Sequence, residues 1–143
     1  MTPLPPPTIS LNLAGARILL THASEFMGPA LREVFMEQGA EVIASDAALD
    51  SAAAVERLIA ASGQIDVLVA NLAFKAPTTA ATEVGDDEWR AVFAALVDPL
   101  PWLVRAVTPA MIARRSGKIL VIGSASGLRG MKRASTYSAA RGA

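Results

Sequence analysis

The segment Ala16–Asp46, "ARILLTHASEFMGPALREVFMEQGAEVIASD", contains the pattern that decides the fold. Its apolar run at Ile18–Thr21 is short enough for a buried strand, and a helical pattern follows over Gly28–Gln38. Gly39 is a usual stop for such a helix, and "EVIAS" after it has the composition of a second strand. A strand, a helix and a strand in this order predict a parallel pair joined by a right-handed crossover.

The same alternation continues to the end of the chain. Apolar residues recur at helical spacing over 51–63, and the continuous apolar run "IDVLVAN" (65–71) is too short for a helix. A helix that opens with acidic residues is expected over 82–96, and "GKILVIGS" (117–124) has the pattern of a fourth strand. The sequence therefore predicts an α/β protein with a Rossmann-like, doubly wound parallel sheet.

Prolines and polar residues mark the expected boundaries of this domain. We place it at residues 13–143, after a proline-rich segment at 1–12 that is expected to be a disordered tail. Ser135 or Thr136 is expected to cap a last helix. The helical stretch after residue 96 is expected to break or kink at its prolines, which are Pro99, Pro101 and Pro109.

Composition excludes several classes of function. The 143 residues carry 13 basic and 13 acidic side chains, so charge gives no reason to expect binding to nucleic acid or an anionic membrane. The chain has no cysteine and one histidine, His22, which leaves no cysteine site and no histidine cluster for a metal. It has neither a basic, apolar leader nor about 20 uninterrupted apolar residues. We expect a soluble cytoplasmic protein.

Ser124, Tyr137 and Arg141 form the candidate catalytic group. Sites in parallel sheets lie beyond the carboxyl ends of the strands, and Ser124 follows the fourth strand. Tyr137 and Arg141 are four residues apart and so share a helix face, where a permanent cation favours the phenolate. Such a tyrosine can act as a base while Ser124 orients a substrate oxygen. The alternative is a capped helix with a surface arginine and a buried tyrosine.

The turn "THASEFMG" (21–28) lies where a dinucleotide-binding protein has three glycines. Only Gly28 remains, and His22 and Phe26 stand where small residues are expected. Phe26 would keep the backbone from closing on a pyrophosphate, although a plain core aromatic is the alternative. For His22, a hydrogen bond to backbone is favoured over a catalytic role.

Three further residues follow the carboxyl ends of strands. Asp46 is expected to be a turn residue, because no nucleotide ribose is expected there. Asn71 is expected to hold the loop after the third strand. Phe74 could line a substrate pocket, with core packing as the alternative.

The segment Leu13–Ala143 resembles the first half of a short-chain dehydrogenase/reductase, with three departures. Arg141 replaces the lysine of Tyr-x-x-x-Lys, His22 and Phe26 replace two glycines of the turn, and Leu96 stands where that family has an asparagine. Together these departures resemble the halohydrin dehalogenases, a cofactor-free offshoot, and "LAGARILLTHASEFMGPALREVFMEQGAEVIAS", "IDVLVANLA" and "STYSAARGA" look nearest to its B type.

This resemblance implies cofactor-independent conversion of vicinal haloalcohols to epoxides, with release of halide, and the reverse opening of epoxides by small anions. Ser124, Tyr137 and Arg141 would be catalytic, and the halide or substrate pocket would be lined by Phe26, His22, Asn71 and Phe74. The implied partners are a small haloalcohol or epoxide and a halide ion. The implied assembly of the full-length protein is a homotetramer that pairs through the helices around 86–115 and from Tyr137.

Two other functions stay open from the sequence. One is an NAD(P)-dependent short-chain oxidoreductase, and the other is an inactive scaffold or oligomerisation unit. Because the resembled family's sheet continues past the residue that corresponds to Ala143, we expect a C-terminally incomplete domain, either a fragment or a truncated product.

Overall fold

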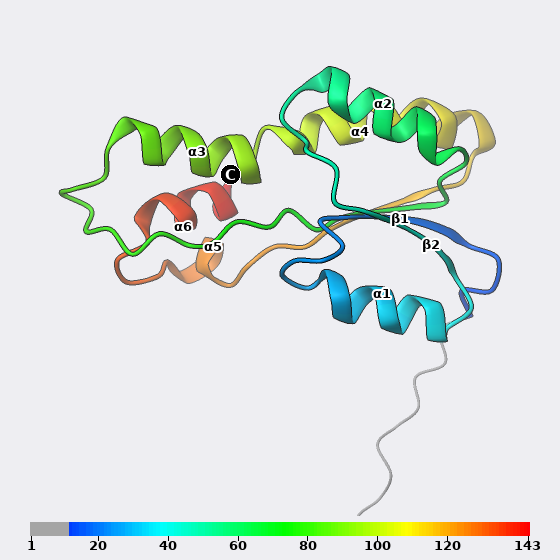
Figure 1. The fold of residues 1–143 in the computed structure, drawn as a ribbon, viewed down its shortest axis with the longest axis horizontal. Coiled ribbons are helices and arrows are strands. Elements are labelled where there is room, and N and C mark those ends of the chain that lie inside the picture. Colours follow the sequence, from blue (N-terminus) through cyan, green and yellow to red (C-terminus); the bar gives the residue numbers. More distant parts are fainter. Residues whose placement is uncertain (1–11) are drawn as a thin grey trace, which may run out of the picture.

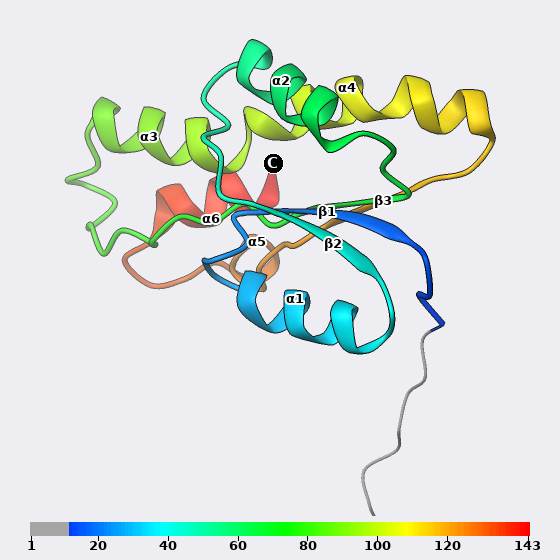
Figure 2. The ribbon, with the colours of Figure 1, turned by 45° about the vertical axis from the view of Figure 1, so that its right-hand side comes forward.

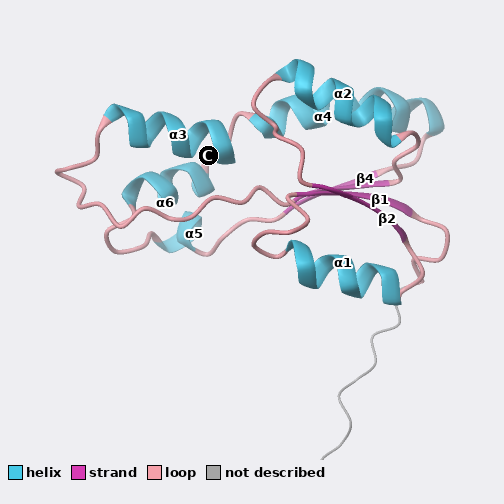
Figure 3. Ribbon diagram, in the orientation of Figure 1, coloured by secondary structure: helices cyan, strands magenta, loops and turns pink. Residues whose placement is uncertain are grey.

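A four-stranded parallel sheet forms the centre of the protein, shown as magenta arrows in Figure 3. In this computed structural model residues 12–143 are described, so the predicted tail at 1–12 lies outside the described part except for Asn12. The strand order is β2-β1-β3-β4. The strands are β1 (Arg17–Thr21), β2 (Glu41–Ser45), β3 (Val67–Ala70) and β4 (Lys118–Val121).

Helices cover both faces of this sheet. In Figures 1 and 2, α1 lies against one face, α2 and α4 lie against the other, and α3, α5 and α6 lie beyond the carboxyl ends of the strands. The predicted doubly wound α/β fold is therefore confirmed. The helices are α1 (Gly28–Glu37), α2 (Ala52–Ser62), α3 (Asp86–Leu96), α4 (Pro99–Arg114), α5 (Ser126–Arg129) and α6 (Ser135–Gly142).

The register brings all four carboxyl ends to one edge. Leu19 in β1 pairs with Ile43 in β2 and with Leu68 in β3, which in turn pairs with Ile119 in β4. Side chains alternate between the two faces, so Ile18 and Leu20 pack toward α1 while Leu19 joins the larger core under α2 and α4. Apolar residues buried on both faces explain the continuous apolar strands.

The expected break near Pro99 is present, whereas the cap predicted for the last helix was wrong. The helical stretch breaks at Val97 and Asp98, and Pro99 opens α4, where the missing N–H of proline has no cost. Pro101 and Pro109 lie within α4 without ending it. The residue before α6 is Ala134, so no side chain caps this helix, because the Thr136 hydroxyl donates to Glu88 instead.

The run Asp86–Arg114 meets the length and composition expected of a membrane-crossing helix, with a mean hydropathy of 1.4 over its most apolar window. It is divided into α3 and α4, which pack on different partners: α3 on α6, and α4 on α2. Of that window, 28% is buried inside the protein.

Gly28 allows α1 to approach the turn that precedes it. A Cβ at this position would lie 2.5 Å from the carbonyl oxygen of His22 and 2.6 Å from that of Ala23. Backbone would have to shift, so Gly28→Ala is expected to lower the free energy of unfolding by about 1–3 kcal/mol. Gly123→Ala is the control, because a Cβ there meets nothing within 4 Å, and we expect a change below about 0.5 kcal/mol. Urea unfolding of both variants measures the difference, and equal stabilities would contradict the close approach.

Candidate active site

Arg141 is held by three acceptors at the carboxyl edge of the sheet. Its Nε donates to the Tyr137 hydroxyl oxygen at 3.0 Å, as the four-residue spacing predicts. Its Nη1 donates to the carbonyl of Ile122, just after β4, at 3.1 Å, and its Nη2 donates to the carbonyl of Leu72, just after β3, at 2.8 Å. Because the guanidinium is planar and rigid, three bonds to three segments fix its orientation.

Phe26 lies against the same guanidinium. The Cζ atom of Arg141 is 5.2 Å from the centre of the Phe26 ring and 5.1 Å from the centre of the Tyr137 ring. Both distances are within the range of cation–π attraction. Phe26 is 51% exposed, so the alternative of a plain core aromatic is wrong. The altered turn and the Tyr137–Arg141 pair therefore meet at one place.

Ser124 approaches this cluster from the end of β4. Its Oγ accepts hydrogen bonds from the hydroxyl of Ser126 at 2.9 Å and from the Ser126 N–H at 3.3 Å. With its oxygen accepting from Ser126, the Ser124 hydroxyl keeps its own proton to donate outward. Within residues 12–143, no hydrogen bond joins Ser124 to Tyr137.

Ser124 and Arg141 share an open depression of about 560 Å³, a size typical of small-molecule sites. Gly127, Leu128 and Gly142 also line it. Tyr137 does not line this depression, because it is 7% exposed and its ring packs in the main core. Arg141 is therefore the residue that connects the buried phenol to the open side of the site.

The turn before α1 keeps a glycine-like backbone although two of its glycines are absent. His22 has φ +44° and Phe26 has φ +52°, both in the left-handed region that favours glycine. Each such residue costs about 1–3 kcal/mol, which the surrounding structure must offset.

Side chains that follow β3 and β2, the two strands on either side of β1, hold this turn. The Asn71 Nδ2 donates to the carbonyls of His22 at 2.8 Å and Glu25 at 3.0 Å. Asn71 thus fixes the turn before α1, which corrects the prediction that it holds its own loop after β3. Its Oδ1 is buried and has no partner among the described residues.

Asp46 fixes the same turn from the end of β2, as expected for a turn residue. Its carboxylate accepts the Ser24 hydroxyl at 2.6 Å and the Ser24 N–H at 2.9 Å. The bond from the Ser24 hydroxyl, followed by the backbone bond, lowers the pKa of Asp46 below its usual value. The carboxylate is therefore occupied within the protein.

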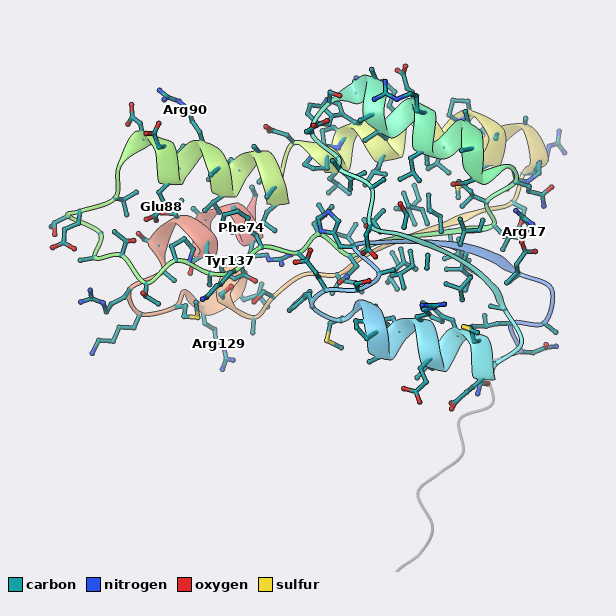
Figure 4. The ribbon with its side chains drawn as sticks, in the orientation of Figure 1. Arg17, Phe74, Glu88, Arg90, Arg129 and Tyr137 are labelled. Carbon is teal, nitrogen blue, oxygen red and sulfur yellow. The ribbon has the colours of Figure 1, made fainter. Side chains whose placement is uncertain are left out.

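The sequence left two alternatives open for His22 and for Phe74, and the structure shows the surroundings of both. The His22 Nδ1 accepts the N–H of Ala73 at 2.8 Å, so the expected bond to backbone is present. Phe74 is partly buried against the main core, which includes Tyr137, as expected for a core residue (Figure 4). Neither residue lines the depression shared by Ser124 and Arg141, so their place in a substrate pocket stays a prediction.

Glu88 is a residue of this region that the sequence did not single out. One carboxylate oxygen accepts the buried Thr136 hydroxyl at 2.8 Å, and the other accepts the hydroxyl of Thr79. This bridge ties α3 to the start of α6, one residue before Tyr137. In the sequence Glu88 is one of three acidic residues in the first turn of α3, a pattern that predicts only a favourable helix terminus.

Comparison with known proteins identifies the family. Residues 11–143 match the family described as short chain dehydrogenase. The chain belongs to this family. The Ser124, Tyr137 and Arg141 cluster accordingly lies at the carboxyl edge of a short-chain dehydrogenase sheet.

The relatives of this chain carry different activities in their names. The 3-oxoacyl-(acyl-carrier-protein) reductase FabG of Vibrio harveyi is 27% identical over 92% of this chain and 64% of its own length. The galactitol 2-dehydrogenase of Cereibacter sphaeroides is 36% identical over 91% of this chain and 52% of its own. A solved structure named as a dehalogenation enzyme is 28% identical, with a TM-score of 0.81, over 92% of this chain and 63% of that chain. The chain thus spans between half and two thirds of the length of these relatives.

Proposed function

We propose that this short-chain dehydrogenase family member is a halohydrin dehalogenase that works without a cofactor. The observation that carries the proposal is the position of the Arg141 guanidinium, bonded to the Tyr137 hydroxyl and lying against the Phe26 ring. One permanent cation thus contacts both the candidate base and the residue that replaces a glycine in the turn. The similarity to a dehalogenation enzyme supports the same function.

The proposed reaction converts a vicinal haloalcohol to an epoxide. The Ser124 hydroxyl donates a hydrogen bond to the substrate oxygen, and Tyr137, assisted by Arg141, takes the proton of the substrate hydroxyl. The substrate hydroxyl must reach the Tyr137 oxygen past Arg141, because Tyr137 does not itself line the depression. The alkoxide then attacks the adjacent carbon, so that a C–O bond forms while the carbon–halogen bond breaks. The halide leaves with the bonding electron pair, and the proton stays on Tyr137 until it passes to solvent.

The turn is a poor fit for the dinucleotide that dehydrogenases of this family use. A pyrophosphate needs free N–H groups and close backbone approach. Here the Gly28 N–H donates to Glu25, Pro29 has no N–H, and the Phe26 ring occupies the space beside Arg141. Asp46 is already bonded to Ser24 rather than free for a ribose. No step of the proposed reaction uses a nicotinamide.

The start of α1 is a poor site for the halide. Two of its first three residues offer no free N–H, because the Gly28 N–H donates to Glu25 and Pro29 has none. The electropositive features nearest to the site are the Arg141 guanidinium and the edge of the half-exposed Phe26 ring. We propose that the halide leaves along Phe26 rather than into the helix terminus.

A cofactor-dependent oxidoreductase is the second candidate, favoured by the names of the curated relatives. The deciding assay measures bromide release from a small bromoalcohol with no added cofactor, beside ketone reduction with NADH. Cofactor-free bromide release with no saturable NADH binding supports the dehalogenase. Reduction that depends on NADH, without bromide release, would overturn it.

Arg141→Lys is expected to lower kcat/KM by about 10- to 100-fold, because an ammonium cannot serve three acceptors in one plane. The remaining cation keeps partial activity, while its weaker hold on the phenolate moves the pH optimum upward. Arg105→Lys is the control, since Arg105 is exposed on α4, away from the site. A pH–rate profile for both variants tests the expectation, and an unchanged Arg141→Lys profile would remove Arg141 from the mechanism.

Phe26 can be tested with a pair of variants that separate backbone strain from side-chain function. Phe26→Ala loses the contact with Arg141, worth about 0.5–1 kcal/mol, and keeps the left-handed strain. Phe26→Gly loses the same contact but relieves the strain, so it should be more stable than the alanine variant by about 1 kcal/mol in urea unfolding. Both variants should show weaker inhibition by added bromide. An alanine variant as stable as the glycine one would contradict the strain.

A further inference from the structure

We propose that His22 is a positioning residue that holds Arg141 against Tyr137 through a single peptide group. The His22 Nδ1 accepts the N–H of Ala73 at 2.8 Å, and the Arg141 Nη2 donates to the carbonyl of Leu72 at 2.8 Å. The Leu72 carbonyl and the Ala73 N–H belong to the same peptide bond. His22 and Arg141 therefore form hydrogen bonds with opposite edges of one rigid peptide plane.

The peptide bond makes this link stiff. It is planar and, like every peptide bond of the described chain, trans, so its C=O and N–H point in opposite directions. Rotation that frees the N–H must also turn the carbonyl away from Arg141. A displaced carbonyl removes one of the three acceptors that orient the guanidinium toward Tyr137. The position of His22 is thus transmitted to the catalytic pair without direct contact.

The peptide group that His22 holds is buried. Leu72 is 1% exposed and Ala73 is 8% exposed. A buried N–H without an acceptor is costly, so the peptide group would reorient when the imidazole is removed. The three acceptors of Arg141 are then no longer presented in one arrangement.

The position requires two properties that few residues combine. The side chain must place an acceptor at its δ position, and the backbone must adopt φ +44°. Asparagine has an Oδ1 acceptor and tolerates the left-handed region. Glutamine carries its acceptor one carbon further out and glycine has none, although glycine suits the backbone well.

The test uses His22→Asn, His22→Gln and His22→Gly, and one of its two readouts is independent of the reaction. Tyr137 is the single tyrosine of the chain, so the ultraviolet absorbance of tyrosinate during an alkaline titration reports on Tyr137 alone. In the glutamine and glycine variants the tyrosinate absorbance should appear at a higher pH than in the wild type, because the Arg141 cation is no longer held beside the hydroxyl. The asparagine variant should titrate like the wild type.

The second readout is halide release, which rests on the proposed function. His22→Gln and His22→Gly should lower kcat by about tenfold or more, whereas His22→Asn should keep most of it. Asp50→Asn is the control, because it changes the same depression without touching Ala73, and its tyrosinate titration should not move. Circular dichroism confirms that each variant is folded.

Two results separate failure of this inference from failure of the proposed function. If His22→Gly titrates like the wild type, or if His22→Asn behaves like His22→Gln, the link from His22 to Arg141 does not operate. If the wild type releases no halide while the titrations follow the expected order, the dehalogenase is wrong and the positioning role of His22 stands.

Discussion

Tyr137→Phe is expected to abolish halide release, with a loss in kcat of about 10²- to 10⁴-fold, the usual contribution of a general base. Tyr137 is the only phenol in the chain, and its hydroxyl oxygen accepts the Arg141 Nε at 3.0 Å. Removing that oxygen leaves Arg141 bonded to the carbonyls of Ile122 and Leu72 but leaves no group to take the substrate proton. Bromide release at saturating bromoalcohol measures the loss.

The fold should survive this change. The Tyr137 ring is buried in the main core and phenylalanine fills the same space, so the free energy of unfolding should fall by about 1 kcal/mol or less. Retention of more than a few per cent of the activity in a folded variant would remove Tyr137 as the base.

Ser124→Ala is expected to have the next largest effect, with a loss of about 10²- to 10³-fold, the scale for removing one donor to a reacting oxygen. Ser126→Ala is the matched control, two residues away. Ser126 is buried and donates to the Ser124 oxygen, so it orients Ser124 without lining the depression that Ser124 shares with Arg141. Ser126→Ala should lower the activity by about tenfold or less, which is the effect of losing one neutral hydrogen bond.

The ranking of these two serines is the informative result. If Ser126→Ala loses more activity than Ser124→Ala while both variants remain folded, Ser126 holds the substrate oxygen and the arrangement at the end of β4 must be revised. Equal losses would assign the function to the hydrogen-bonded pair rather than to Ser124.

Most elements of the fold could be predicted because their signals are local. The apolar runs at Ile18–Thr21 and 65–71, the glycine stop at Gly39 and the acidic start of α3 each depend on residues that are near in sequence. The exception depends on a contact that is distant in sequence. No side chain caps α6, because the expected cap Thr136 bonds to Glu88, 48 residues earlier in the chain.

In the candidate site, too, contacts between residues near in sequence could be predicted and contacts between distant residues could not. The four-residue spacing of Tyr137 and Arg141 predicts their contact, since helix geometry brings such residues together. The sequence does not predict that Phe26 lies half exposed against Arg141, because 115 residues separate them. Nor does it predict that Asn71 holds the turn before α1, since that depends on β1 and β3 being neighbours in the sheet.

The sequence by itself determined the doubly wound sheet, the edge at which the candidate residues gather, and the pairing of Tyr137 with Arg141. All three follow from short-range periodicity and from the rule that parallel strands share one carboxyl edge. Only the tertiary structure decided what holds Arg141 in place. Its remaining acceptors are backbone carbonyls of Leu72 and Ile122, and every residue carries a carbonyl, so residue identity cannot indicate which of them face the guanidinium.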